Sequence, residues 1–156
     1  MVIKMAKLIM LIGIPGSGKT TYSKELKIKY DAEVISSDRV RQTYKGIDEK
    51  NVFPTVYKLC IEELKEGRNV IIDATHITPK VRKRSFDALD QYGINYEKVA
   101  IYIETSVEEC ARRVEIRNQD PNELFLPVDV VYSYGNNIIP PSKEEGFSEI
   151  HIIKGE

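Results

Sequence analysis

The sequence has little cysteine and no tryptophan: two cysteines, Cys60 and Cys110, occur in 156 residues. They lie far apart and form no CxxC or CxxxH pattern, so neither a disulfide framework nor a zinc site is expected. Long hydrophobic runs are also missing, since residues 8–12 form the longest and a bilayer span needs about 20. The first residues lack the pattern of a secretory signal. We therefore expect a cytoplasmic protein without a membrane span.

Charge of one sign is not in excess, because 23 lysines and arginines face 24 aspartates and glutamates. The formal net charge of −1 excludes a protein that coats nucleic acid through bulk positive charge. It leaves room for a local basic groove. With 42% hydrophobic residues, the chain can bury a core of ordinary size. We expect residues 1–156 to form a single domain.

Buried strands alternate with helical segments along the chain. Residues 7–13 are apolar at every interior position, which is typical of a strand buried on both faces. Thr78-Pro79 is a helix start signal, and Gly67 and Gly93 are stop signals. The other expected strands are 33–36, 69–73, 98–103 and 149–153, and the expected helices are 19–30, 38–45, 51–66, 79–92, 106–118 and 127–137. This order predicts an α/β fold: a doubly wound parallel sheet of about five strands flanked by helices, with ligands at the carboxyl ends of the strands.

A phosphate-binding motif follows the first expected strand. Residues 13–20 read Gly-Ile-Pro-Gly-Ser-Gly-Lys-Thr, which fits G-x-x-x-x-G-K-[ST] between a strand and a helix and predicts a P-loop. Its backbone amides converge on phosphate oxygens, and the helix N-terminus adds positive potential. Lys19 should reach the β- and γ-phosphates, and the Thr20 hydroxyl should ligate Mg²⁺. The expected ATP-binding residues are Gly13, Pro15, Gly16, Ser17, Gly18, Lys19, Thr20 and Thr21.

Motifs elsewhere in the chain separate the classes of P-loop protein. Asp73 ends the apolar run 70–73 like the acidic residue of a Walker B strand, and it is a second candidate Mg²⁺ ligand. It is not followed by the D-x-x-G pattern of a GTPase switch, and no N-K-x-D or L-S-G-G-Q motif occurs. These patterns favour a kinase.

Asp38 and Arg41 follow the second expected strand, where a substrate hydroxyl can approach the γ-phosphate. Asp38 is the candidate base, and orienting the hydroxyl matters more than early deprotonation because phosphoryl transfer is largely dissociative. The alternative for Asp38 is a helix N-cap, and the two roles are compatible. Arg41 lies on the same helix face and could bind an acceptor phosphate in a bidentate manner. Its alternative is a solvated surface arginine.

A lid is expected at residues 106–126. Arg113 and Arg117 lie four residues apart on its helix, just before the most loop-like segment, 118–123. Two guanidinium groups over the phosphates could stabilise transition-state charge, as arginine fingers do. The alternative is pairing with Glu109 or Glu115 on the same helix.

Two further features follow Asp73. His76 could contact the substrate, or it could be an ordinary buried residue. Residues 80–84 include Lys80, Arg82, Lys83 and Arg84, a basic cluster that could follow a nucleic-acid backbone. A solvated helix face is an equally good interpretation of that cluster.

The whole pattern resembles the kinase domain of the 5′-polynucleotide kinases. No D-x-D-x-T motif occurs, so we expect a kinase domain that stands alone, without a phosphatase domain. The resemblance rests on residues 12–21, 37–42, 67–76, 126–131 and 140–150, and covers nearly the whole chain. It implies a general base at Asp38, an acceptor-phosphate contact at Arg41, and a role for Asp73 in the acceptor site or at the metal. Ser37 departs from the family pattern, which often has arginine there.

We therefore expect an ATP-dependent, Mg²⁺-requiring kinase that phosphorylates the 5′-hydroxyl at a single-stranded end of DNA or RNA. The first alternative is a P-loop kinase for a small alcohol or nucleoside, which is favoured if the cluster at residues 80–84 lies far from the active-site mouth. The second is a nucleotide-binding switch without transfer activity, and Asp38 argues against it.

Overall fold

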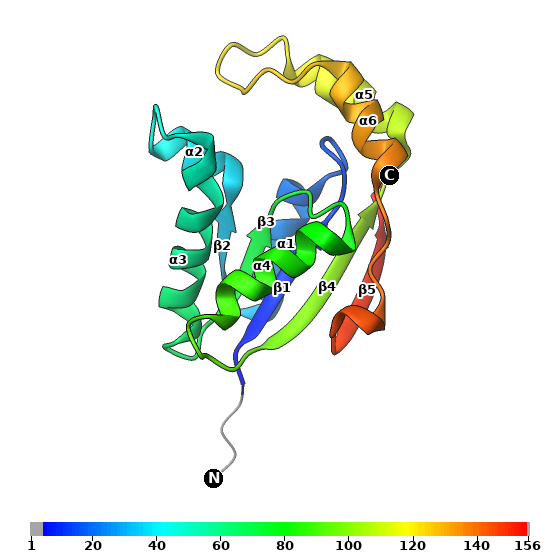
Figure 1. Cartoon of the computed structure of the whole chain (residues 1–156). Coiled ribbons are helices and arrows are strands. Elements are labelled where there is room, and N and C mark those ends of the chain that lie inside the picture. Colours follow the sequence, from blue (N-terminus) through cyan, green and yellow to red (C-terminus); the bar gives the residue numbers. More distant parts are fainter. Residues whose placement is uncertain (1–4, 156) are drawn as a thin grey trace.

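The computed structural model describes residues 5–155, and within them five parallel strands form one sheet (Figure 1). The strand order is β2-β3-β1-β4-β5. The strands are β1 (Lys7–Ile12), β2 (Ala32–Ser36), β3 (Asn69–Asp73), β4 (Glu97–Glu104) and β5 (Glu149–Lys154). This arrangement confirms the predicted doubly wound sheet, and each strand lies within one residue of its expected bounds at either end.

The helices follow the expected alternation. They are α1 (Lys19–Tyr30), α2 (Ser37–Thr43), α3 (Val52–Leu64), α4 (Pro79–Asp90), α5 (Val107–Arg117) and α6 (Val128–Asn137), with short 3₁₀ turns η1 (Glu49–Asn51) and η2 (Lys143–Glu145). Capping residues set their starts: the Thr78 side chain accepts a hydrogen bond from the Val81 amide, with Pro79 in the first turn. No helix within residues 5–155 is long and apolar enough to cross a membrane.

Helix α2 begins earlier than expected. The Ser36 hydroxyl accepts a hydrogen bond from the Arg39 amide at 3.2 Å, so Ser36 is the N-cap. Asp38 lies inside the first turn of the helix, where a carboxylate complements the positive end of the helix dipole. The N-cap interpretation of Asp38 is therefore wrong.

Both faces of the sheet are covered, as the apolar composition of β1 requires. Leu8 and Met10 pack on one side into a cluster that includes residues of α3 and α4, whereas Ile9 and Leu11 pack on the other side with Leu26 of α1. A third cluster joins the P-loop to α5 and α6 through Ile14, Cys110, Ala111, Val114 and Val131. Both cysteines are buried and free.

The loops at the carboxyl ends of the strands lie at one edge of the sheet. In Figure 1 the segment that joins α5 to α6, residues 118–127, arches over this edge toward α2. The Asn118 side chain holds both ends of this arch, because it donates to the Leu126 carbonyl at 2.7 Å and accepts from the Leu126 amide at 3.0 Å. The predicted lid thus spans α5 and a loop that is closed on itself.

Candidate active site

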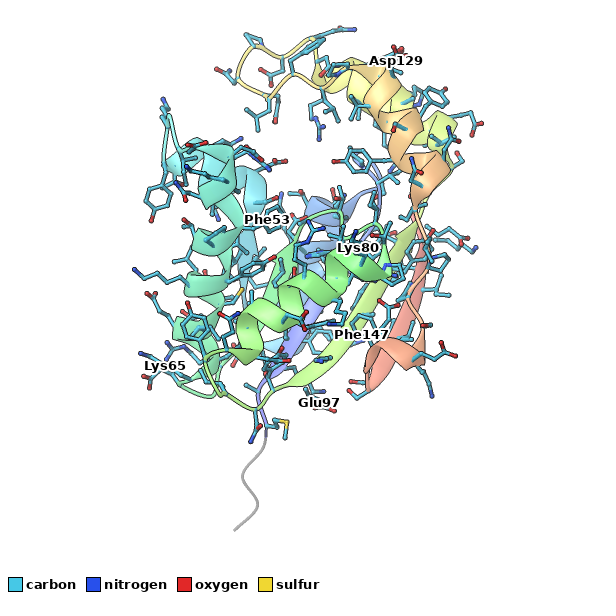
Figure 2. The ribbon with its side chains drawn as sticks, viewed as in Figure 1. Phe53, Lys65, Lys80, Glu97, Asp129 and Phe147 are labelled. Atoms are coloured by element: carbon cyan, nitrogen blue, oxygen red, sulfur yellow. The ribbon has the colours of Figure 1, made fainter. Side chains whose placement is uncertain are left out.

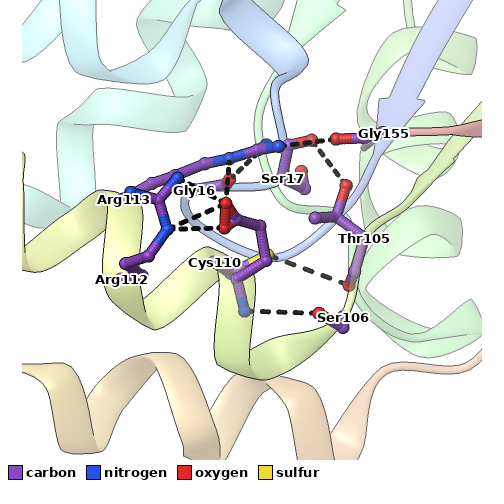
Figure 3. A network of polar contacts seen from close by, with 9 residues as sticks. Gly16, Ser17, Thr105, Ser106, Cys110, Arg112, Arg113 and Gly155 are labelled. Atoms are coloured by element: carbon purple, nitrogen blue, oxygen red, sulfur yellow. Dashed lines mark hydrogen bonds and ion pairs between the residues drawn. The ribbon is translucent and has the colours of Figure 1, made fainter.

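The P-loop is fixed from two sides. The Gly13 amide donates to the Thr75 carbonyl at 3.1 Å, and the Thr105 hydroxyl donates to the Ser17 carbonyl at 2.8 Å (Figure 3). Gly16 has a φ of 85°, and a Cβ there would lie 2.6 Å from the Cys110 carbonyl oxygen. Only glycine fits at this position, because the loop turns with positive φ directly against α5.

Lys19 is the first residue of α1, and its side chain reaches back to the start of the P-loop. Its ammonium donates to the carbonyl oxygens of Gly13 at 2.9 Å and Ile14 at 3.0 Å. Burial lowers the pKa of Lys19 to about 8, although Asp73 and Asp38 oppose this shift by favouring the charged form. Lys19 is therefore still largely protonated at neutral pH and can neutralise a phosphate.

The lowered pKa of Lys19 predicts a pH-dependent affinity for ATP. Phosphate oxygens favour the charged ammonium, so ATP binding should raise the pKa of Lys19 again. Below pH 8 the lysine carries its proton already and the Kd should be constant. Above pH 8 binding must take up a proton, and the Kd should rise by about tenfold per pH unit. Calorimetric titration with ATP between pH 7 and pH 9.5 measures this.

The control for this titration is Lys19→Arg, whose guanidinium stays charged over the whole range. The Kd of this variant should not follow the same curve, whatever its absolute value. A wild-type Kd that stays constant to pH 9.5 would contradict the assignment of the transition to Lys19.

Thr20 and Asp73 place two oxygen atoms that can bind a metal close together. The Thr20 hydroxyl donates to Asp73 Oδ2 at 3.1 Å, and the Asp73 side chain ends β3 in a buried position. Burial raises the pKa of Asp73, while Lys19 and Thr20 act to lower it. A hydroxyl and one carboxylate beside a phosphate-binding loop fit Mg²⁺, which prefers oxygen ligands and keeps substrate phosphates and waters as the others. Within the described part of the chain, no group of three or more His, Cys, Asp or Glu side chains could hold a metal by itself.

A cavity of about 910 Å³ opens above the P-loop and brings most of the expected site residues together. The expected residues that line it are Pro15, Gly16, Gly18, Lys19, Thr20, Thr21, Asp38, Arg41, Asp73, Arg113 and Arg117. Gly13 and Ser17 lie in the buried part of the loop instead, with the Ser17 side chain fully enclosed. Their contribution is to the shape of the loop.

Asp38 and Arg41 are in contact on α2. The Arg41 Nη1 group donates to Asp38 Oδ1 at 2.7 Å, and its Nε and Nη2 groups donate to both carboxylate oxygens of Glu49. The Arg41 side chain is 29% exposed, so it is not the freely solvated arginine of the alternative interpretation.

The two arginines of α5 differ in their contacts. Arg113 donates to the carbonyl oxygens of Gly16 at 3.2 Å and Gly155 at 2.8 Å, joining α5 to the P-loop and to the residue after β5 (Figure 3). Arg117 lies one turn further and lines the cavity, and its guanidinium has no hydrogen-bond or ion-pair partner among residues 5–155. Glu109 pairs with Arg112 at 2.5 Å and with Arg113 at 3.7 Å, so the alternative of pairing within the helix applies to Arg113 and not to Arg117.

His76 does not line the cavity. The side chain is 1% exposed, and its Nδ1 atom is 2.7 Å from the Leu11 carbonyl oxygen, to which it must donate. Burial lowers the pKa of His76 to about 4, so the ring is neutral. The structure therefore contradicts the expected substrate contact: the His76 side chain is enclosed in the loop after β3 and does not line the cavity.

The basic residues at 80–84 do not form one surface. Arg82 is fully buried and pairs with Glu145 at 2.7 Å, whereas Lys83 pairs with Asp87 at the surface of α4. Figure 2 labels Lys80 at the start of this helix. None of the four residues lines the cavity.

Apolar residues that belong to none of the sequence motifs form part of the cavity wall. Phe53, labelled in Figure 2, comes from the first turn of α3, and Leu124 and Phe125 come from the arch at residues 118–127. Phe125 is 72% exposed, which is unusual for a large aromatic side chain. The signal in the sequence for Leu124 and Phe125 is that they form an apolar pair directly after the polar segment 118–123.

The fold and this cavity define a P-loop protein of the kinase type. A family model described as an AAA domain matches residues 8–133, and the chain belongs to this family.

Comparison with known proteins confirms the resemblance to polynucleotide kinases. The chain is 28% identical over 148 residues to the bifunctional polynucleotide phosphatase/kinase of Schizosaccharomyces pombe. The aligned region covers 94% of this chain and 33% of that protein. The chain thus spans about a third of the length of this relative.

Two solved structures share the fold. A fungal RNA kinase superposes with a TM-score of 0.70 at 20% identity, covering 99% of this chain and 77% of that one. A gluconokinase from Sinorhizobium meliloti superposes with a TM-score of 0.61 at 15% identity, covering 97% and 84%. Both likenesses concern the fold alone.

Proposed function

We propose that this protein is an ATP-dependent polynucleotide 5′-hydroxyl kinase, which transfers the γ-phosphoryl group of ATP to the 5′ end of DNA or RNA. The observation that carries the proposal is the Asp38–Arg41 pair, held at 2.7 Å on the wall of the cavity that also contains the P-loop. Asp38 orients and deprotonates the acceptor hydroxyl, and Arg41 binds the phosphate that follows the terminal sugar. The polynucleotide relative supports this acceptor.

The other residues of the cavity fit the same reaction. Lys19 would hold the β- and γ-phosphates, and Thr20 and Asp73 would hold Mg²⁺, which would supply positive charge beside the transferring group. Phe53, Leu124 and Phe125 give the outer part of the cavity an apolar surface. A nucleobase presents a flat π-face to such a surface, whereas a small polyol does not.

Label transfer from γ-labelled ATP tests the proposed function. With Mg²⁺ present, a 5′-hydroxyl oligonucleotide should become labelled, and the same oligonucleotide with a 5′-phosphate should not. The absence of label on any 5′-hydroxyl oligonucleotide, while ATP still binds, would reject this acceptor.

The second candidate is a kinase for a small alcohol or nucleoside. The observation that favours it is the dispersal of residues 80–84, none of which lines the cavity. A panel of nucleosides and sugar alcohols in the same assay distinguishes the two, because the polynucleotide kinase should have the higher kcat/KM for the oligonucleotide.

Substitution of the two lid arginines should have different effects. Arg117→Met removes a cation that has no other partner, so kcat should fall by about 10²-fold with little change in ATP affinity. Arg113→Met removes the bonds to Gly16 and Gly155, which loosens the loop and should raise the KM for ATP. Steady-state kinetics with ATP as the varied substrate separates the two effects.

Arg112→Met is the matched control, because Arg112 lies beside Arg113 but points to the surface, where it pairs with Glu109. This variant should keep the kinetics of the wild type. If Arg117→Met changes only the KM for ATP, then Arg117 binds the ground state and does not stabilise the transferring phosphoryl group.

A further inference from the structure

The guanidinium of Arg41 is occupied on two sides. Its Nε group lies 3.2 Å from both carboxylate oxygens of Glu49, and its Nη2 group lies 2.5 Å from Glu49 Oε1. The Nη1 group is bound to Asp38. Arg41 therefore bridges the candidate base and a second carboxylate, which does not line the cavity itself.

Glu49 occupies the edge of the Arg41 guanidinium that would bind a phosphate. Arginine binds phosphate best through two parallel N–H groups, and the Nε/Nη2 pair offers this arrangement. Since Glu49 accepts from both Nε and Nη2, a phosphate that approaches Arg41 through this edge must take the place of Glu49. An acceptor that brings only a hydroxyl to Asp38 does not have to do so.

The segment that carries Glu49 can move away from Arg41 without losing much packing. Every residue from 42 to 51 is exposed except Ile47, which is partly buried, and the Glu49 side chain is 70% exposed. Gly46 turns with a φ of 83° in open space. Withdrawal of Glu49 thus costs little packing, and the ion pair itself is a surface pair of modest strength.

We propose that Glu49 is a specificity-determining residue that competes with the acceptor phosphate for Arg41. It weakens the binding of acceptors that carry a phosphate beside the reacting hydroxyl, and it leaves acceptors without one unaffected. This inference rests on the proposed function for its consequence in catalysis, but the competition for Arg41 is independent of it.

Titration with inorganic phosphate tests the competition directly. The Nε–H resonance of Arg41, assigned by its loss in Arg41→Gln, is followed in ¹⁵N-labelled protein saturated with ADP and Mg²⁺, so that the P-loop is filled. Phosphate should bind at Arg41 about fivefold more tightly in Glu49→Gln than in the wild type, as expected for the loss of one exposed ion pair. Equal or weaker binding in Glu49→Gln overturns the proposal.

The matched control is Glu63→Gln, which removes the same charge from the Glu63–Arg68 pair at the other end of α3. Phosphate binding at Arg41 should equal that of the wild type in this variant. An increase there as large as that in Glu49→Gln would show a general charge effect and would also overturn the proposal.

A kinetic measurement then separates this proposal from the proposed function. For a 5′-hydroxyl dinucleotide and the matching nucleoside, the ratio of the nucleoside KM to the dinucleotide KM should rise about fivefold in Glu49→Gln. A loss of kcat with both acceptors would show that Glu49 merely positions Arg41, against the proposal. If the wild-type protein labels no oligonucleotide but the phosphate titration gives the expected difference, the proposed function fails and the competition at Arg41 stands.

Discussion

Asp38→Asn is expected to lower kcat for phosphoryl transfer by about 10²- to 10⁴-fold, the range for loss of a general base. The amide keeps the size of the side chain and an oxygen that can accept the hydrogen bond from Arg41 Nη1 at 2.7 Å. It loses the negative charge and the ability to take the hydroxyl proton. The affinity for ATP should stay close to that of the wild type, because the P-loop is unaltered. Single-turnover transfer and equilibrium binding of ATP measure the two quantities separately.

Asp87→Asn is the control for this substitution. Asp87 lies on the exposed side of α4, pairs with Lys83, and does not line the cavity, so the same chemical change should leave transfer intact. If Asp38→Asn transfers phosphate at more than a tenth of the wild-type rate, Asp38 is not the base, and the acceptor hydroxyl must be oriented by another group of the cavity wall.

The strands and helices could be predicted because their signals are local. An unbroken apolar run such as that of β1 needs cover on both faces, which is a property of parallel sheets and is visible without any partner. Thr78 and Pro79 mark the start of α4 within a few residues of chain. The start of helix α2 is less certain from sequence, because serine and aspartate are both good N-cap residues and only the observed hydrogen bond from the Arg39 amide identifies Ser36 as the cap.

The candidate site could be predicted where its residues are close in sequence or follow neighbouring strands. The P-loop supplies Lys19 and Thr20 within eight residues of chain, and the carboxyl ends of β2 and β3 bring Asp38 and Asp73 to it by the topology of the sheet. Phe53 and Phe125 could not be assigned in this way. Their position on one cavity depends on how α3 and the arch at residues 118–127 are oriented, which no local pattern encodes.

The burial of polar side chains could not be predicted from the sequence either. The sequence suggests His76 as a substrate contact because it follows the Asp73 strand, and Arg82 as a nucleic-acid contact because it belongs to a basic cluster. Arg82 is buried because Glu145, 63 residues later, folds back against α4. The sequence of a helix does not show whether a charged residue has such a distant partner. Without that knowledge, a charged residue is expected to be exposed.

Arg82→Met is expected to lower the free energy of unfolding by about 3–5 kcal/mol, the cost of breaking a buried ion pair. The Arg82 guanidinium is fully buried and donates to Glu145 at 2.7 Å and 3.2 Å, and to the His76 carbonyl at 2.7 Å. Glu145 is only 12% exposed, so the variant leaves a carboxylate with little solvent. Urea unfolding, monitored by circular dichroism, measures the change.

Arg84→Met separates this effect from any general role of charge on α4. Arg84 lies two residues away on the same helix and is exposed, so its removal should change the free energy of unfolding by less than about 0.5 kcal/mol. The double variant Arg82→Met, Glu145→Leu should recover part of the loss, because no unpaired charge remains buried, but not all of it, since Glu145 also accepts from the Ser142 amide at 2.9 Å. If Arg82→Met and Arg84→Met destabilise the protein equally, the buried pair is not what holds the segment before β5 against α4.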